Sequence, residues 1–404
     1  MKESLLNVVS YLKDCSNDSL FATSTCGGGI TLYGTVYANS TSGYLGETKE
    51  LGDELLCFIA ACQSSETGLV AGPELNAFVH EAGSMHDLEH LTLHSTCSVL
   101  PFCQEHGIEL RPIVGAHKFC DLAYLEVWLS ERDLENAWFE GNNILFVGQM
   151  LLYLRDVEKL TGAEEALEYW FDWLDSEVDP LTSLWGSNGS CSNAAAVYGG
   201  YHQLLLYWHE EHPIVNPEGL VDTVLDLQHL DGGFNPKGNG GACEDVDSVD
   251  ILVNCYKRYD YRRAEIGEAL RRCKRHILRT QNADGGFPYN RDQPQSHMGI
   301  PGTEAGPNVS CTFPTWFRVH TLALIAEILP DEPEFRGVEF SFNEALSMGW
   351  HKSPAGWCRA AVRIPAREVL YAKCSYIFCR GKSYMNRILR GCYRRAFARN
   401  LKKP

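Results

Sequence analysis

The segment LQHLDGGF at residues 227–234 decides the fold, because it returns as RTQNADGGF at residues 279–287. Gln228 and Gln281 stand 53 residues apart, and each is followed by an aspartate, two glycines and a phenylalanine. A weaker copy, QSSETGL, occupies residues 63–69. A sequence that recurs at such a distance is typical of an array of repeated structural units.

The glycines of each copy predict a turn that ends a helix. Glycine reaches the left-handed backbone conformation that closes the last turn of a helix, where other residues are strained. The glutamine and the acid of each copy can hydrogen bond the backbone groups that such a turn leaves exposed. A unit of 53 residues has room for two helices and two loops.

Apolar residues with helical spacing dominate the chain, and strands are hard to find. The expected helices span residues 5–12, 51–62, 75–80, 88–103, 144–157, 163–174, 193–208, 220–227, 246–256, 266–279, 313–329 and 342–348. Short polar or glycine-bearing loops join them. This pattern of about twelve helices indicates an all-α fold.

The unit Q-x-x-D-G-G-F resembles the glutamine–aromatic repeat of the terpenoid cyclase and protein prenyltransferase superfamily. In that family, helix pairs form an inner and an outer ring, an α/α toroid, and the expected helices would fill one ring of about six pairs. The resemblance covers residues 51–329 and implies a toroid over residues 1–340, followed by a basic amphipathic helical extension over residues 341–404. A helical array of another family with glycine turns is the alternative.

Two further stretches fit such a ring. LWGSNG at residues 184–189 looks like another loop of the repeat, with Trp185 as the loop aromatic. WFEGNN at residues 138–143 precedes the helix expected at 144–157 in the same way. Gly199 and Gly200, in the alanine-rich helix that follows, would let inner helices approach closely.

The segment CEDVDSVDIL at residues 243–252 holds four acids, Glu244, Asp245, Asp247 and Asp250. Carboxylates so close repel one another, so at least one should hold its proton more tightly than a free aspartate does. A carboxyl group that stays protonated is a Brønsted acid. The alternative is that Asp245 or Asp247 only caps the helix that begins here.

Class II terpene cyclases, in the family that the repeat resembles, protonate an alkene or epoxide with the middle aspartate of a D-x-D-D or D-x-D-T/S-T motif. DVDS at residues 245–248 is similar to the second form, which implies that Asp247 is the acid and that Asp245 and Ser248 orient it. Asp250, one helical turn further, would join this network. The two residues after DVDS depart from the family pattern.

Alkene protonation needs a dry pocket in which aromatic faces stabilise a carbocation. The aromatic residues expected to bind the substrate are Trp316, Trp185, Tyr198, Phe287 and Phe313. The run at residues 288–311, rich in Gly, Pro, Asn and Gln, is too long for a simple turn, and we expect it to form a lid over the pocket.

We expect no metal at this site. The related prenyltransferase β subunits hold zinc with an Asp-x-Cys pair and a later histidine, but here Cys243 precedes Asp245 and His320 lies about one turn too late. A DDxxD motif is also missing, so magnesium is expected only if the substrate is a diphosphate.

Three histidines with a spacing of four residues, His86, His90 and His94, share one helix face. Adjacent pairs could bind a metal, whereas buried or rim histidines are the simpler expectation. The 16 cysteines are scattered without a CxxC pair, which favours reduced thiols in a core over a zinc finger.

Charge divides the chain into an acidic body and a basic tail. The net charge is −17, yet residues 345–404 carry 14 Lys and Arg against the single acid Glu368. Such a tail is typical of contact with an anionic membrane surface, although it could instead dock on the acidic body or bind a substrate diphosphate. Without a nucleic-acid motif, nucleic acid is the least expected partner.

No apolar run of about 18 residues and no signal-peptide cleavage site are found, so we expect a cytoplasmic protein that the tail could hold at a membrane. The leading hypothesis is a class II terpene cyclase-like enzyme acting on a polyprenyl or prenyl diphosphate substrate without a cofactor. A non-catalytic toroid that binds a lipid or a protein is one alternative, and a prenyltransferase-like transferase is another.

Overall fold

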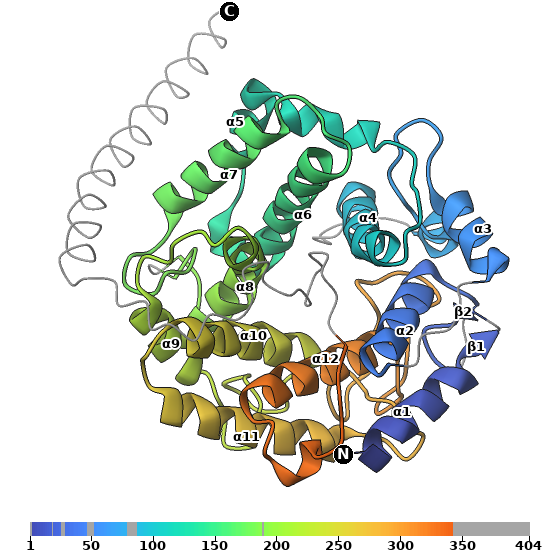
Figure 1. Cartoon of the computed structure of the whole chain (residues 1–404), viewed down its shortest axis with the longest axis vertical. Coiled ribbons are helices and arrows are strands. Elements are labelled where there is room, and N and C mark those ends of the chain that lie inside the picture. Colours follow the sequence, from blue (N-terminus) through green and yellow to red (C-terminus); the bar gives the residue numbers. More distant parts are fainter. Residues whose placement is uncertain are drawn as a thin grey trace, which may run out of the picture.

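The computed structural model describes residues 2–341, except residues 18, 26–28, 47–51, 79–86 and 188–189. In this part of the chain, inner and outer helices alternate and number six each (Figure 1). The inner ring consists of α2 (Leu32–Tyr44), α4 (Leu88–Glu105), α6 (Ala137–Asp156), α8 (Asn193–His209), α10 (Ala242–Arg258) and α12 (Thr312–Ile328). The outer ring consists of α1 (Lys2–Asp14), α3 (Asp53–Cys62), α5 (Leu122–Ser130), α7 (Ala163–Glu177), α9 (Pro217–Leu225) and α11 (Arg263–Thr280). The all-α toroid expected from the repeat is confirmed.

The inner ring is closed. Each inner helix packs against the next inner helix along the chain, and α12 returns to pack against α2. Short elements lie between the helices: β1 (Ser16–Asn17) pairs antiparallel with β2 (Leu20–Phe21), and the 3-10 helices are η1 (Pro73–Ala77), η2 (Val114–Cys120), η3 (Leu134–Asn136) and η4 (Pro333–Phe335). The first and last helix pairs are therefore neighbours.

The two rings differ in how much of each helix is buried. The inner helix α8 buries every residue from Ala196 to Trp208, because neighbours cover it on all sides. The outer helix α7 buries only a stripe of residues three or four apart, Ala163, Ala166, Leu167, Trp170, Phe171 and Leu174. One apolar stripe is what a helix needs when its other face meets water.

Glycine allows the inner helices α6 and α8 to approach closely. A Cβ atom on Gly199 would lie 2.1 Å from the carbonyl oxygen of Ala137, and one on Gly141 would lie 2.5 Å from the carbonyl oxygen of Gly199. A methyl group cannot fit at either distance. The close packing expected from Gly199 is confirmed.

The glutamine of each repeat links its own turn to the next outer element. Gln228 Nε2 donates to the carbonyl oxygens of Gly232 and of Ala269 on α11, both at 2.8 Å. Gln281 Nε2 donates to the carbonyl oxygen of Gly285 at 2.8 Å and to that of Ser4 on α1 at 2.9 Å. The repeat signature is therefore a joint between neighbouring units, not only a helix end.

The weaker third copy behaves in the same way. Gln63 Nε2 donates to the carbonyl oxygens of Gly68 at 2.8 Å and of Arg111 at 2.7 Å. Gly68 has a φ of +71°, as the turn requires. The short sequence match at residues 63–69 therefore predicted a true copy.

Several expected elements differ from the observed ones. Residues 138–143 belong to α6 and do not form a loop, because the helix already begins at Ala137. In place of the helix expected at residues 75–80, the structure has the 3-10 helix η1 at Pro73–Ala77. Residues 79 and 80 lie outside the described residues. Helices α2 and α5 were not predicted. The expected helix at residues 342–348 and the extension at 342–404 lie outside the described residues.

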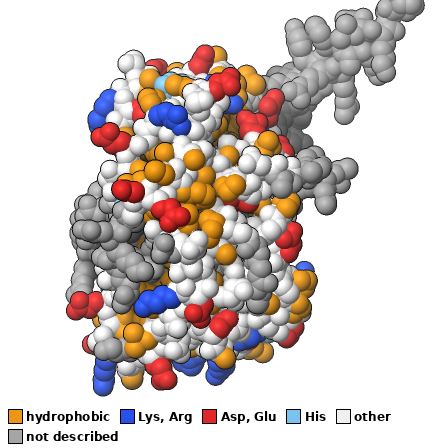
Figure 2. All heavy atoms as spheres, turned by 90° about the vertical axis from the view of Figure 1, so that its right-hand side faces the viewer, with side chains coloured by type: hydrophobic (Ala, Val, Ile, Leu, Met, Phe, Trp, Pro, Cys, Tyr) orange, Lys and Arg blue, Asp and Glu red, His pale blue; other side chains and the backbone are white. Residues whose placement is uncertain are grey.

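Part of the outer surface is apolar. Figure 2 shows the side of the ring on which α3 lies, where hydrophobic side chains gather in the middle and charged ones lie around them. On α3, Leu56, Cys57, Ala60 and Ala61 are exposed. None of the described helices combines the length and the apolar character that crossing a bilayer requires.

Candidate active site

A cavity of about 650 Å³ lies at one end of the inner ring. All six inner helices contribute to its wall, mostly from their N-terminal and middle turns. Their lining residues are Tyr33, Tyr37, His90, His94, Trp138, Phe139, Asn142, Ala195, His202, Cys243, Asp247, Phe313, Pro314 and Phe317. The cavity thus combines aromatic faces with histidines and a single described carboxyl group.

That carboxyl group belongs to Asp247, in the second turn of α10. The residue is 1% exposed, and its Oδ2 atom has no hydrogen-bond partner. Burial, followed by the charges of Glu244, Asp250 and Asp245, holds the pKa of Asp247 well above its usual range. The carboxyl group therefore keeps its proton under conditions in which a free aspartic acid is ionised.

The acid cluster does not cap α10, so helix capping does not explain why the acids lie there. Gly241 occupies the N-cap, and α10 begins at Ala242. Asp245 and Asp247 therefore lie inside the helix, and neither is its capping residue. The helix begins four residues earlier than the start at residue 246 that the apolar pattern suggested.

Asp245 accepts a backbone hydrogen bond that a threonine hydroxyl accepts in another unit of the ring. Its Oδ1 accepts the backbone N–H of Phe234 at 2.8 Å, directly after the repeated turn. Thr315 Oγ1 accepts the N–H of Phe287 at 3.0 Å in the next unit, and Thr35 occupies the same fourth position of α2. One role of Asp245 is therefore to secure the turn, as a hydroxyl group does elsewhere.

A carboxylate at this position is matched by a buried cation. Arg318 of α12 is fully buried and donates to Asp245 Oδ2. It also donates to the carbonyl oxygens of Gly240 at 3.0 Å and of Tyr289 at 3.1 Å. Arg318 thereby ties together α12, α10 and the two loops beside the cavity.

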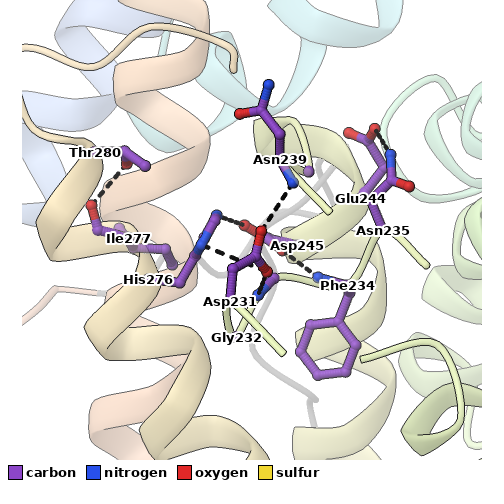
Figure 3. A network of polar contacts seen from close by, with 12 residues as sticks. Asp231, Gly232, Phe234, Asn235, Asn239, Glu244, Asp245, His276, Ile277 and Thr280 are labelled. Carbon is purple, nitrogen blue, oxygen red and sulfur yellow. Dashed lines mark hydrogen bonds and ion pairs between the residues drawn. The ribbon is translucent and has the colours of Figure 1, made fainter. Parts of the chain in front are cut away.

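His276 of α11 joins this ion pair to the repeated turn (Figure 3). Its Nε2 lies 3.7 Å from Asp245 Oδ2, and its Nδ1 lies 3.9 Å from Asp231 Oδ1. Asp231 also accepts the backbone N–H groups of Gly233 at 2.9 Å and of Asn239 at 2.8 Å. The turn and the start of α10 form one polar network.

The two remaining residues of the predicted network, Ser248 and Asp250, are buried but do not line the cavity. Ser248 Oγ has no hydrogen-bond partner. Asp250 Oδ1 accepts from Asn254 Nδ2 at 3.0 Å, and burial raises the pKa of Asp250 to about 7. Asp250 influences Asp247 by its charge and not by a hydrogen bond.

Of the aromatic residues expected to bind the substrate, Phe313 lines the cavity. Trp316 lies one layer behind the wall. Its ring stacks on Tyr37, with centroids 4.6 Å apart and planes at 16°, and Tyr37 faces the cavity. Trp316 supports the wall rather than forming it.

Trp185, Phe287 and Tyr198 do not line the cavity. Trp185 and Phe287 are core residues with exposed fractions of 1% and 0%. The Trp185 indole donates to the carbonyl oxygen of Leu174 at 2.9 Å, at the end of an outer helix. The Tyr198 hydroxyl donates to the carbonyl oxygen of Phe234 at 2.8 Å. The partner of Trp185 lies on the outer helix α7 and that of Tyr198 lies in the repeated turn, and neither side chain lines the cavity.

The long loop at residues 288–311 forms part of the cavity wall, and its role as a lid stays a prediction. It supplies Tyr289, Asn290, Gln293, Pro294, Gln295, Ser296, His297, Met298, Thr303 and Cys311 to the wall. Gln295 and Ala305 form an isolated antiparallel bridge that closes the loop on itself. The His297 ring lies 4.5 Å from that of Phe313 and 4.6 Å from that of Tyr33.

Two of the three spaced histidines lie on the cavity wall. His90 Nδ1 is 2.8 Å from Asn143 Oδ1, and His94 Nδ1 is 2.9 Å from the Tyr33 hydroxyl. His86 lies outside the described residues. The spacing of four residues correctly predicted that His90 and His94 share one face of α4. That face forms part of the cavity wall.

The residues of the zinc site in the related transferases do not fit a metal here. Cys243 faces the cavity, whereas Asp245 is bonded to Arg318. In the described part of the chain, no group of three or more His, Cys, Asp or Glu side chains is placed to hold a metal ion.

Most of the aromatic wall and two of its histidines, His202 and His297, were not predicted from the sequence. Tyr33 and Tyr37 lie on α2, a helix that was not predicted, and Trp138 was assigned to a loop. His202 of α8 was not considered. A spacing of four residues between Tyr33 and Tyr37 was the only available signal for that part of the wall.

A comparison with protein families agrees with this architecture. The model of the prenyltransferase alpha-alpha toroid domain matches residues 2–144 and, a second time, residues 141–301. Among curated proteins, no relative matches the chain. The two family matches follow one another around the ring and together cover most of its helices. The chain therefore belongs to the prenyltransferase alpha-alpha toroid domain family.

Proposed function

We propose that the protein is a class II terpene cyclase-like enzyme in which Asp247 protonates a carbon–carbon double bond or an epoxide of a linear isoprenoid. One observation carries the proposal. Asp247 is a buried carboxyl group that retains its proton and lies on the wall of a cavity with aromatic sides. Asp245 and Asp250 support it, because their charges oppose ionisation of Asp247.

The lining residues suit the charge changes of such a reaction. Protonation of an alkene places a positive charge on carbon, and the faces of aromatic rings stabilise a cation. Tyr33, Tyr37, Trp138, Phe139 and Phe313 supply such faces. As a lid, the loop at residues 288–311 would limit the access of water, which would otherwise capture the cation.

The same wall favours a neutral substrate. Of the described residues that line the cavity, none is Lys or Arg. A diphosphate inside would therefore lack a cationic partner, and burying such a charge unpaired is costly. We propose an uncharged isoprenoid or its epoxide as the substrate, with any diphosphate and its magnesium outside this cavity.

The test is conversion of farnesol, geranylgeraniol, squalene and 2,3-oxidosqualene in heavy water. The wild-type protein should form a cyclic product that carries one solvent deuterium on carbon. Asp247→Asn keeps the shape of the side chain but removes its acidic proton, so turnover should fall by about a hundredfold or more. Asp226→Asn, at an exposed position, is the matched control.

Equal turnover by Asp247→Asn and the wild type would show that Asp247 is not the acid. Binding of these isoprenoids by the wild type without any conversion would instead favour a non-catalytic lipid-binding toroid. Tryptophan fluorescence can report that binding because Trp138 lines the cavity.

A further inference from the structure

The wall holds a second group that could exchange a proton with a substrate. His202 of α8 lines the cavity and is 5% exposed. Its Nδ1 lies 2.7 Å from the carbonyl oxygen of Tyr198, one turn earlier on the same helix. A carbonyl oxygen only accepts hydrogen bonds, so Nδ1 must carry a hydrogen. In the neutral ring, Nε2 then holds the basic lone pair.

The surroundings of His202 keep its ring neutral. Burial, and to a smaller extent the nearby His90, lowers the pKa of His202 to about 4, against the opposing effect of the backbone of Tyr198 and Gly199. The imidazole is therefore uncharged near neutral pH. A neutral ring does not repel a carbocation, and its free lone pair remains available.

A reaction that starts with a proton from an acid must also end. After cyclisation the positive charge remains on carbon, and it disappears either by loss of a proton from a neighbouring carbon or by addition of water. Protons next to a carbocation are extremely acidic, so even a weak neutral base accepts them. A strong base is neither needed nor desirable beside a carboxylic acid that must stay protonated.

We propose that His202 is the catalytic base that ends the cyclisation started by Asp247, an inference that rests on the proposed function. The C–H bond beside the cationic carbon breaks, its electron pair forms a new double bond, and the proton moves to His202 Nε2. The imidazolium then releases this proton to solvent, and Asp247 takes one up. The product is an isomer of the substrate, and both residues return to their starting states.

The fold places Asp247 and His202 on the wall of one cavity. Asp247 is on α10 and His202 is on α8, which are adjacent helices of the inner ring, and both side chains line the same cavity. Cyclisation moves the charge away from the protonated carbon. A base on the neighbouring helix is therefore well situated to meet the charge where it stops, while Asp247 remains at the place where it began.

The decisive variant is His202→Asn. The asparagine amide can keep the hydrogen bond to the carbonyl four residues earlier, as Asn254 does by donating to the Asp250 carbonyl oxygen at 3.0 Å on α10. It supplies no basic nitrogen. The cyclic alkene should fall about tenfold relative to the wild type, and an alcohol formed by water addition should replace it. Turnover should still depend on Asp247.

His202→Phe is a second variant that keeps a flat ring, and His209→Gln, in the last turn of α8, is the control. An unchanged alkene share in both His202 variants would overturn the role of His202 while leaving Asp247 as the acid. A wild-type product that is already an alcohol would also overturn it, since water would then end the reaction. If the wild type forms no cyclic product, the proposed function itself fails, which is a different result.

Discussion

Asp245, Asp247 and Asp250 stand within two turns of one helix, yet they face three different surroundings. Asp245 meets the guanidinium of Arg318, Asp250 lies near the cations of Arg258 and Lys257, and Asp247 faces a cavity without any described cation. The elements around each side chain, and not the local sequence, assign it to structure or to chemistry.

The raised pKa of Asp250 makes stability depend on pH. Its pKa is raised from 3.8 to about 7 by burial, so the folded state binds a proton that the unfolded state has already lost between these values. The free energy of unfolding should therefore fall as the pH rises through this window, by up to about 4 kcal/mol from this residue. Above the folded pKa this contribution to stability is absent.

Asp250→Asn should make this pH dependence shallower. The amide oxygen can still accept from Asn254, but the side chain no longer titrates. Urea unfolding followed by far-UV circular dichroism from about pH 4 to about pH 8 measures the slope. Equal slopes for the variant and the wild type would contradict the assignment, and the exposed Asp226→Asn should leave the slope unchanged.

At the level of single residues, the motif similarity singled out Asp247 but did not predict which residues surround it. A local motif carries the spacing of the acids. It does not show that Arg318, 73 residues later, meets Asp245, or that His202 shares the cavity with Asp247. Trp185 illustrates the opposite error, since an aromatic residue in a glycine loop looks like a substrate contact but packs in the core.

Among the elements, the repeated turn is the best defined. Gly232 and Gly285 have φ values of +101° and +94°, which only glycine adopts without strain. A Cβ atom on Gly285 would lie 2.0 Å from the carbonyl oxygen of Asn7 on α1. The glycine is therefore required for its backbone conformation and for the close approach of the next unit.

Gly285→Ala should destabilise the protein by about 2 kcal/mol or more, because strain and a clash act together. Gly43→Ala is the matched control, since a Cβ atom there meets nothing within 4 Å and the residue lies inside α2. That change should be neutral or slightly stabilising. Thermal unfolding of the two variants measures the difference, and similar midpoints would contradict this role of the turn.

Helices α2 and α5 show why periodicity alone could not predict every element. The sequence of α2, LYGTVYANSTSGY, is buried on several sides and rich in Gly, Ser and Thr, so it shows neither a polar face nor a strong helix propensity. α5 has nine residues, of which Leu125 and Leu129 are buried. Most other helices of the described ring keep a pattern that the sequence reveals.

The whole molecule depends on a contact between distant parts of the chain. Gln281, at the end of α11, bonds the carbonyl oxygen and the hydroxyl group of Ser4 on α1, across 277 residues. Gln228 makes the corresponding joint to Ala269 across 41 residues. In both joints the glutamine amide donates to two carbonyl oxygens, but the amide oxygen accepts from Arg272 at Gln228 and from the Ser4 hydroxyl at Gln281. The joints also differ in the length of chain that must be ordered before they form.

This difference predicts different folding kinetics for two matched variants. Gln281→Leu and Gln228→Leu each leave partly buried carbonyl groups without a donor, so each should lower the free energy of unfolding by about 1 to 3 kcal/mol. Contacts distant in sequence form late, so Gln281→Leu should mainly accelerate unfolding, whereas Gln228→Leu should also slow folding. Stopped-flow tryptophan fluorescence in urea separates the two rates. A slower folding rate for Gln281→Leu that accounts for its whole loss of stability would show that the ring closes early.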